Sequence, residues 1–408
     1  MRDLYVTLGH NASAVLAVDG VVKRGYEQER LDRKKSSSAF PQDAIERALG
    51  PGDDERFADR VYVSHWFDEF ELESNKYLNL PYLNGIGQVI TLSPDLTHHD
   101  VHAQSALDFF GHHTQKERRN AYVVVIDGFG NNQECLSVYE GIPHGPSRLI
   151  HRSYGYQASL GLMYQYVTEY LGMKPHRDEY KLLGYESHIC QHAPRELAVS
   201  NHAIVSRQAQ DHAHRMMNAR NKPRACGALI DYNNLVLAKA QWTEVADMWR
   251  KLWPQQEGEN GIRTVVGFTA QTFLEAAVLE IIECLCLDRS RDLILTGGVF
   301  LNVKLSRRVR RSWIDGNVYA HPLCGDQGAA MGHTLGLATR GLCWGERSMK
   351  PEKKLGKLPI GLYFVDRDEW VEKAAGYIVD GQPVNVVRGA AEYGPRALCN
   401  TTTFAIPN

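Results

Sequence analysis

The sequence lacks a surplus of charge of either sign, because 46 lysines and arginines stand against 48 aspartates and glutamates. The resulting net charge of −2 provides no global basic field for binding nucleic acid. The eight cysteines contain no pair with zinc-finger spacing, and no apolar run is long enough to span a bilayer. The N-terminal residues lack the basic stretch and apolar core of a signal peptide. These absences predict a cytoplasmic protein without a membrane partner.

Two stretches of the chain resemble each other, and together they predict a duplicated α/β unit. The first, at 5–28, contains three short strands with an Asp-Gly hairpin turn between the last two. The second, at 121–139, contains a buried strand that runs into Asp127 and a further strand. Ordinary α/β proteins also contain such stretches, which is the alternative interpretation. Helices are expected at 41–49, 95–111, 158–171 and 268–287.

Four side chains in this pattern are candidate metal ligands. His98 and His102 are four residues apart in a helical stretch, so both imidazoles lie on one face and can bind one ion. Asp127 ends a buried strand, at the edge where α/β folds bind ligands. Asp326 precedes a run of small residues and can bind metal or nucleotide. The ordinary alternatives are a surface histidine pair, a turn aspartate and a helix N-cap.

Further residues are candidates for catalysis or phosphate binding. His10 lies in a tight loop between the first two strands, and histidine is the usual base for a hydroxyl. Gly297 and Gly298 follow a buried strand, where backbone N–H groups can cradle phosphate. Lys35 ends a basic run and Lys181 follows two carboxylates, so either lysine can hold a phosphate. The alternatives are a loop histidine with local partners and charged faces that are simply solvated.

The order of these elements resembles the O-carbamoyltransferase family of antibiotic and nodulation-factor biosynthesis, of the tobramycin carbamoyltransferase type. The resemblance covers the chain from end to end, and its motifs are specific as an ordered set. They are Gly9-His10-Asn11-Ala12-Ser13-Ala14, Glu29-Arg30 with Arg33 and Lys35, Phe40-Pro41, His98-His99 with His102-Ala103, Val125-Ile126-Asp127-Gly128, Ser159-Leu160-Gly161, Tyr170-Leu171-Gly172, Asp178-Glu179-Tyr180-Lys181, Thr296-Gly297-Gly298-Val299 with Asn302, Gly325-Asp326 with Gly328-Ala329-Ala330, and Glu392-Tyr393-Gly394-Pro395-Arg396-Ala397-Leu398.

The resemblance implies an α/β fold of the actin-like ATPase type, similar in its N-terminal part to the tRNA threonylcarbamoyladenosine transferase. Two ribonuclease-H-like halves are expected at 1–112 and 113–345, and the second half contains an insert near 186–260. A linker at 346–360 then leads to the start of an adenylating α/β domain at 361–408. That domain is similar to the enzyme that makes threonylcarbamoyl-adenylate.

The resemblance also implies an activity and a role for each matching residue. Carbamoyl phosphate and ATP give carbamoyl-adenylate and pyrophosphate, and an acceptor hydroxyl then attacks the adenylate. His10 corresponds to the base near this hydroxyl, and Lys35 to a donor contact. The ligands implied for Fe²⁺ or another divalent metal are His98, His102, Asp127 and Asp326. The nucleotide contacts implied for ATP, with Mg²⁺ as a further candidate ion, are Lys181, Gly297, Gly298, Asn302 and Arg396.

The chain departs from the family pattern in two ways. Both concern formation of carbamoyl-adenylate more than transfer of the carbamoyl group to the acceptor. Where the family continues with Gly-Asn-Arg-Ser, this chain has Cys399-Asn400-Thr401-Thr402. The sequence ends at Asn408, so only the first strands of the adenylating domain are expected. A missing segment or a second chain would then complete that domain.

The acceptor is left open by the sequence. The family favours a hydroxyl of a natural product or sugar. A hydroxymethylated nucleobase in DNA is the alternative, because several basic residues lie between 202 and 224 and can track phosphates. A solvated insert is the simpler interpretation of that segment. A different class of function is a non-catalytic nucleotide- and metal-binding module that regulates a partner.

Overall fold

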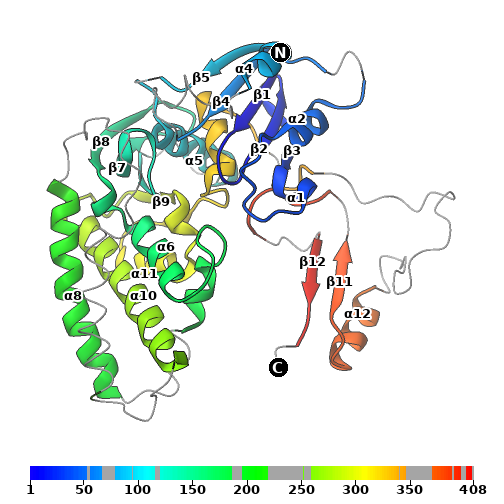
Figure 1. The fold of residues 1–408 in the computed structure, drawn as a ribbon. Coiled ribbons are helices and arrows are strands. Elements are labelled where there is room, and N and C mark those ends of the chain that lie inside the picture. The colour runs from blue at the N-terminus through cyan, green and yellow to red at the C-terminus, as the bar shows by residue number, and fades with distance from the viewer. Residues whose placement is uncertain are drawn as a thin grey trace.

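The computed structural model shows two five-stranded sheets, a layer of helices beside the second sheet and a small C-terminal hairpin (Figure 1). It describes all residues except 53–55, 67–78, 94, 115–119, 186–194, 219–250, 252–258, 340, 346–369, 388–389, 397–400 and 407–408.

The first sheet has the strand order β3-β2-β1-β4-β5. Its strands are β1 (Arg2–Thr7), β2 (Ser13–Val18), β3 (Val21–Glu27), β4 (Arg60–Ser64) and β5 (Gln88–Thr91). β1, β2 and β3 form an antiparallel meander, whereas β4 and β5 continue beside β1 in parallel. Side chains of β1 alternate between two apolar clusters, with Leu4 and Val6 in one and Tyr5 in the other. The sheet is therefore covered on both faces.

The second sheet repeats this arrangement in the order β10-β9-β6-β7-β8. Its strands are β6 (Ala121–Ile126), β7 (Glu134–Gly141), β8 (Ser147–Tyr154), β9 (Asp292–Thr296) and β10 (Val318–Ala320). Again the first three strands are antiparallel neighbours and the last two run parallel to the central strand. The repeated topology confirms the predicted α/β fold of the actin-like type with two ribonuclease-H-like halves.

Two helical segments lie between the sheets. They are α5 (His98–Thr114) and the 3-10 helix η8 (Asp326–His333). Leu107 of α5 packs with Val123 of β6, whereas Met331 of η8 packs against the first sheet. The two segments also touch, because a Cβ on Gly332 would lie only 1.8 Å from the Val101 carbonyl oxygen. Small residues in η8 thus allow α5 to meet it at the interface of the two halves.

Four helices cover the other face of the second sheet (Figure 1). They are α6 (Leu160–Tyr170), α8 (Arg195–Asn218), α10 (Glu259–Cys284) and α11 (Val303–Ser312). Among the described residues, the part of α10 from Arg263 to Cys284 is long and apolar enough to cross a membrane. The expectation that no apolar run reaches this length is therefore wrong. Within that segment, 72% of the most apolar window is buried inside the protein, and Ile281 shares a cluster with Ile126 of β6.

The four helices expected from the sequence are present with shifted ends. The helix predicted from 95 begins at His98, and the one predicted from 268 begins nine residues earlier as α10. Gly172, with φ +75°, follows the end of α6, where glycine is common. The chain from Gly298 forms a 3-10 turn and becomes α11 only after Asn302. The helix predicted at 41–49 is α2 (Gln42–Leu49), and other helices of the described residues are α1 (Gln28–Asp32), α4 (Leu80–Asn84), η2 (Asn131–Gln133), η3 (Tyr156–Ala158), η4 (Glu179–Lys181) and η7 (Gly298–Leu301).

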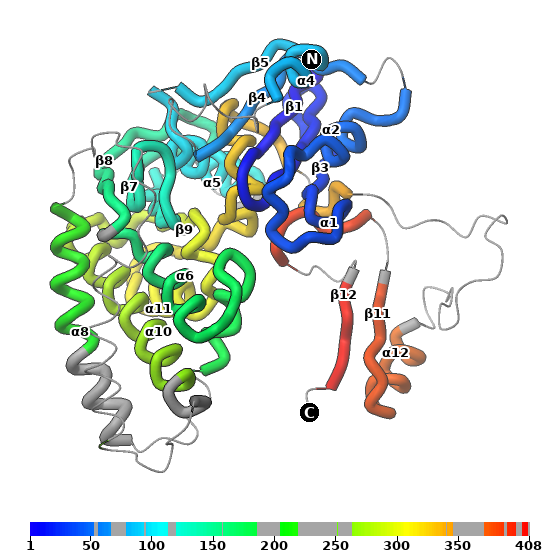
Figure 2. The backbone as a smooth tube through the Cα atoms, viewed as in Figure 1, coloured from blue at the N-terminus to red at the C-terminus, as the bar shows by residue number. Residues whose placement is uncertain are grey.

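The C-terminal part contributes a small hairpin and a segment that returns to the first half. The hairpin contains α12 (Trp370–Val379) and the antiparallel strands β11 (Val384–Val387) and β12 (Thr401–Phe404), and it stands apart from both sheets in Figure 2. Tyr393, only 1% exposed, packs instead against Trp344 in the cluster beneath the first sheet. The predicted linker at 346–360 lies outside the described residues, and the predicted domain limits stay predictions.

Candidate metal centre

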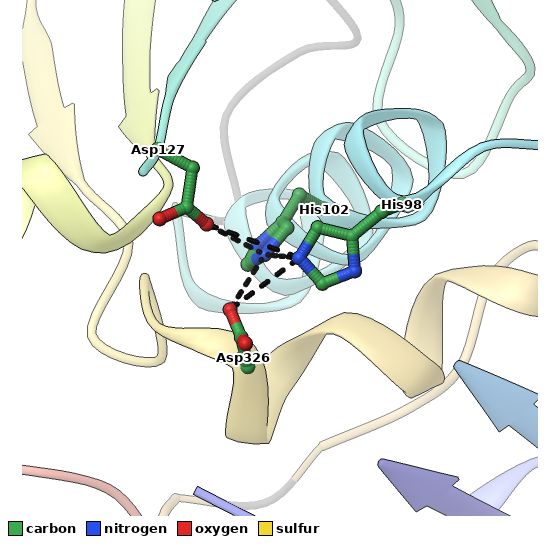
Figure 3. A group of neighbouring side chains, drawn as sticks. All are labelled: His98, His102, Asp127 and Asp326. Carbon is green, nitrogen blue, oxygen red and sulfur yellow. Dashed lines mark hydrogen bonds and ion pairs between the residues drawn. The ribbon is translucent and has the colours of Figure 1, made fainter. Parts of the chain in front are cut away.

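His98 and His102 lie one turn apart on α5 and point at the same spot (Figure 3). Both side chains are buried, and their Nε2 atoms are only 3.1 Å apart. The ring planes meet at 83°, so the two nitrogens converge rather than stack. The two histidines therefore lie on one face of a helix, as their spacing in the sequence predicts.

Two carboxylates complete the cluster. Asp127 follows β6, and its Oδ2 lies 3.8 Å from Nε2 of His98 and 3.6 Å from Nε2 of His102. Asp326 begins η8, and its Oδ1 lies 3.4 Å and 3.5 Å from the same two nitrogens. The four ligand atoms all lie within 4.8 Å of one another. The structure therefore brings together all four residues that the sequence indicated as ligands.

These spacings fit a single divalent cation. Two ligand atoms that are each about 2.1 Å from one ion lie about 3.0 Å apart at a right angle and about 3.4 Å apart at a tetrahedral angle. Asp127 Oδ2 is also buried and has no hydrogen-bond partner among the described residues. A buried carboxylate oxygen without a partner is costly. A cation at the centre would provide the missing partner.

A second group of possible ligands shows how distinctive this cluster is. His214 of α8 lies near Glu280 and Cys284 of α10, and its side chain is exposed. His214 Nε2 already pairs with Glu280 Oε1 at 3.1 Å, and the Cys284 thiol donates to the same carboxylate. Each of these groups therefore has an ordinary partner. Within the described part of the chain, the buried cluster is the better metal site.

The charges of the buried cluster stabilise one another. Burial alone would lower the pKa of His98, but the carboxylates of Asp326 and Asp127 outweigh burial and raise this pKa to about 10. Burial would likewise raise the pKa of Asp326, yet the imidazoles of His10, His98 and His102 hold it well below its usual range. Without metal, the site thus keeps a proton on an imidazole between two carboxylates. A cation would replace that proton.

Glycines let three chain segments close around Asp127. Gly297 has φ +92°, and a Cβ there would lie 2.4 Å from the carbonyl oxygen that ends β6. A Cβ on Gly298 would lie 2.8 Å from Asp127 Oδ1, and one on Gly161 would lie 2.7 Å from Gly128 Cα. The glycine pair predicted to contact nucleotide therefore packs directly against the candidate ligand Asp127 and the residue before it. Its contact with a nucleotide stays a prediction.

Two other predicted nucleotide contacts lie just beyond this turn. Asn302 caps α11 by accepting a hydrogen bond from the Leu305 N–H at 3.0 Å, and its amide donates to Gln271 at 2.8 Å. Arg396 donates from Nη2 to the Leu301 carbonyl at 3.0 Å, so it ties the C-terminal segment to η7. Sequence reasoning missed the capping role of Asn302, although Asn before a helix is a known signal for it.

His10 lies on the open side of the cluster, in the loop after β1. Its Nε2 is 3.4 Å from Asp326 Oδ2, and its side chain is 35% exposed. The ring of His176 lies 5.3 Å away, centroid to centroid. Burial and the neighbouring His10 lower the pKa of His176 to about 4. No spacing pattern in the sequence links His176 to His10, so the sequence gives no local signal for this contact.

The two predicted phosphate-binding lysines meet on the segment at 174–181 rather than at the cluster. The Lys35 ammonium donates to the Arg177 carbonyl and lies 4.3 Å from the centroid of the Tyr180 ring. Lys181 pairs with Asp178 at 2.9 Å, and this bond raises the pKa of the lysine. Both lysines are exposed, and neither contacts a candidate ligand in the described part of the chain.

The family model described as "Carbamoyltransferase N-terminus" matches residues 87–335. The matched region contains the four candidate ligands, Lys181, the glycine pair and Asn302. His10, Lys35 and Arg396 lie outside it.

Several curated proteins are similar to most or nearly all of the chain. Nodulation protein NolNO of Sinorhizobium fredii is 25% identical over 443 residues, which cover 99% of this chain and 59% of that protein. Nodulation protein NolO of Bradyrhizobium diazoefficiens is 24% identical over 76% of this chain and 53% of that protein. An uncharacterized protein of Methanocaldococcus jannaschii is 23% identical over 98% of this chain and 72% of that protein. The chain therefore spans only part of each relative.

Solved structures with similar folds are more distant in sequence. The activator of the 2-hydroxyisocaproyl-CoA dehydratase from Clostridium difficile aligns over 81% of this chain and 93% of its own, with 13% identity and a TM-score of 0.43. A ROK family glucokinase from Streptomyces griseus aligns over 81% and 98%, with 12% identity and a TM-score of 0.35. Because these scores are low, the fold assignment rests on the repeated strand order.

Proposed function

The chain belongs to the carbamoyltransferase N-terminus family, and we propose that it transfers a carbamoyl group to a hydroxyl of an acceptor molecule in the cytoplasm. The observation that carries this proposal is the position of His10 on the open side of a buried cluster of two histidines and two aspartates. This arrangement supports the proposal of a proton acceptor beside a cation site. Both groups suit the attack of a hydroxyl on an unreactive carbonyl.

The donor needs a good leaving group, because the carbamoyl nitrogen donates electrons into the carbonyl and makes it a weak electrophile. We propose that carbamoyl phosphate, ATP and water give carbamoyl-adenylate, phosphate and pyrophosphate. AMP then leaves when the acceptor oxygen bonds to the carbamoyl carbon. Residues 361–408 are proposed as the start of the adenylating domain, which a further segment or a second chain would complete.

In the transfer step, His10 takes the proton of the acceptor hydroxyl as the oxygen attacks. Its Nε2 faces Asp326 at 3.4 Å, which leaves Nδ1 to accept the proton. The Asp326 carboxylate stabilises the imidazolium that forms. The neighbouring His176 is neutral at pH 7, because its pKa is lowered to about 4, so it adds no opposing charge. Lys35 is proposed as a donor contact.

His98, His102, Asp127 and Asp326 would hold the metal ion. Two imidazoles and two carboxylates suit Fe²⁺ and other first-row divalent ions better than Ca²⁺, which prefers oxygen ligands. When bound, such an ion supplies Lewis-acid polarisation of a carbonyl or phosphate oxygen. The ligand side chains are buried, so they need little reorganisation to bind it.

We propose the turn at Gly297-Gly298 as the nucleotide site, with Mg²⁺ accompanying the phosphates. Arg396 supports this position, because it contacts the Leu301 carbonyl at the end of the same turn. Lys181 is the further phosphate contact that the family motif suggests. Asn302 holds the start of α11 beside the turn and would act through the backbone it caps.

A small-molecule hydroxyl, as in a natural product or sugar, is the proposed acceptor. The alternative, a hydroxymethylated nucleobase in DNA, needs a continuous basic track on α8. Arg207 and Arg215 are exposed there, but His212 is buried and bonds to the Ala158 carbonyl at 3.0 Å. This interruption favours the small molecule. Four other basic residues of this proposed track have side chains that the structure does not describe: His202, Arg220, Lys222 and Arg224.

The test begins with pyrophosphate release from ATP, measured with and without carbamoyl phosphate. Transfer of ¹⁴C from carbamoyl phosphate to a panel of sugar hydroxyls follows, with the C-terminal part of a longer relative supplied as a second chain if release is absent. We expect His10→Ala to keep metal binding and to lose transfer. His214→Ala, which removes an exposed histidine of α8, is the matched control and should keep both.

Transfer by His10→Ala at the wild-type rate would contradict the role of His10. A wild-type chain that binds ATP and metal, yet neither releases pyrophosphate nor transfers label with the second chain present, would contradict the transferase. That result would instead identify a non-catalytic nucleotide- and metal-binding module.

A further inference from the structure

The first turn of α5 has an acceptor for each of its backbone N–H groups. The N–H of Thr97 donates to Asp100 Oδ2 at 2.7 Å, and the N–H of Asp100 faces Thr97 Oγ1 at 3.5 Å. The N–H of His98 donates to Asn131 Oδ1 at 2.8 Å, and that of His99 to Glu134 Oε1 at 3.0 Å. Two acceptors are thus local and two come from another part of the chain. This turn carries the metal ligand His98 as the first residue of the helix.

Glu134 is fully buried, with 0% of its surface accessible. Besides the His99 N–H, it accepts a hydrogen bond from Thr97 Oγ1 at 3.0 Å. The Arg152 guanidinium lies 3.2 Å from its Oε2 and also bonds to Asp100 at 2.5 Å. A buried carboxylate is tolerated only with such partners. Burial raises the pKa of Glu134 to about 7, whereas the Arg152 guanidinium favours the charged form.

The acceptors come from the loop that begins with another ligand. Asp127 follows β6, Asn131 lies in η2 of the connection to β7, and Glu134 is the first residue of β7. The Gly130 N–H donates to the Glu134 carbonyl at 2.7 Å and closes the loop. A Cβ on Gly130 would lie 2.6 Å from Glu134 Oε1, so only glycine leaves room for the carboxylate. One short loop therefore carries Asp127 and also holds the helix that carries both histidines.

We propose that Glu134 is a positioning residue for the metal centre: it fixes the first turn of α5, and thereby the direction of the His98 imidazole relative to Asp127. The inference rests on the metal site of the proposed function, although it concerns residues that touch no metal. Helix ends fray unless their N–H groups are bonded, and His98 lies within the turn that would fray. His102 lies a turn further in, so its direction depends less on Glu134.

The test measures binding of Co²⁺ to the metal-free full chain by calorimetry, together with the d–d absorption of the bound ion. Residues that hold metal ligands in place change metal affinity by about 10–100-fold when removed. We therefore expect Glu134→Ala to weaken Co²⁺ binding by about tenfold or more and to shift the absorption bands. Glu134→Gln keeps an acceptor for the His99 N–H and should recover most of the affinity.

Two controls separate positioning from general stability. Glu140→Ala removes a partly exposed carboxylate from the same strand and should leave Co²⁺ binding unchanged. Val309→Ala opens a cavity under α11, and it should lower the melting temperature without altering the absorption bands. If Glu134→Ala does not fold, Co²⁺ binding is compared between Glu134→Gln and Glu134→Asp instead. The shorter Asp side chain cannot reach the helix, so Glu134→Asp should weaken Co²⁺ binding more than Glu134→Gln.

Wild-type affinity and wild-type bands in Glu134→Ala, or equal shifts in Val309→Ala, would overturn the positioning role. Failure of the proposed metal site is a separate result, because the wild-type chain itself would then not bind Co²⁺.

Discussion

Replacing Gly298 by alanine tests how closely the glycine turn supports the metal centre. The added Cβ would lie 2.8 Å from Asp127 Oδ1, whereas an ordinary contact begins near 3.4 Å. The carboxylate must therefore retreat by about 0.6 Å. It would then lose the hydrogen bond that Oδ1 accepts from the Gly128 N–H at 2.7 Å. A hydrogen bond to a charged group contributes about 1.5 kcal/mol, which corresponds to about a tenfold loss of metal affinity.

The assay is titration of metal-free Gly298→Ala with Co²⁺, alongside titration with ATP. Gly184→Ala is the matched control, because a Cβ there would meet no atom of the described residues within 4 Å and its backbone φ is ordinary. We expect weaker Co²⁺ binding in Gly298→Ala alone. Unchanged Co²⁺ affinity would refute the reasoning about Asp127. Unchanged Co²⁺ affinity with weakened ATP binding would show that the turn serves the nucleotide instead.

Three further predictions follow from the buried contacts. The carboxylates of Asp326 and Asp127 outweigh burial and raise the pKa of His98 to about 10. Metal binding at pH 7 should therefore release about one proton. Calorimetry in two buffers of different ionisation enthalpy detects this release. The same pKa shift should stabilise the metal-free protein fully below pH about 6.5, and progressively less as the pH rises through about 10. Urea unfolding in the presence of a chelator measures this stability. Equal unfolding free energies at pH 6 and 10 would contradict the prediction. Tyr393→Phe removes the hydrogen bond from a buried hydroxyl to the Gln327 carbonyl at 2.6 Å and should cost about 1 kcal/mol of stability, whereas the exposed control Tyr170→Phe should cost nothing measurable.

The candidate ligands were the part of the site most accessible to sequence reasoning. His98 and His102 were predicted from their spacing, because two residues four apart on a helix share a face whatever surrounds them. Asp127 was predicted from its place after an apolar strand, which is again a local feature. Asp326 was harder, since a glycine-flanked aspartate also suits a helix start. The family resemblance implied its role as a ligand, and the packing of η8 against α5 brings its carboxylate to the two histidines.

Other residues of the site have no local signal. Glu134 follows three polar residues in a loop, and nothing in that stretch indicates that its carboxylate reaches the start of α5. Tyr393 lies far from Gln327 in the sequence, so their hydrogen bond depends on the path of the C-terminal segment. The basic segment after 202 was judged by composition alone. His212 there is buried, because one face of α8 packs onto the second sheet's helical layer.

The sequence by itself determined what depends on neighbouring residues: strand and helix periods, the glycine turns and the facing pair of histidines. The repeated strand pattern could also be predicted, because each sheet begins with the same local sequence of strands. Only the tertiary structure decided that ligands from positions 98, 127 and 326 meet at one point. That meeting depends on small residues that let η8 touch α5, and on a loop that both carries Asp127 and bonds the start of α5. Contacts of this kind join residues far apart in the chain, and no local pattern encodes them.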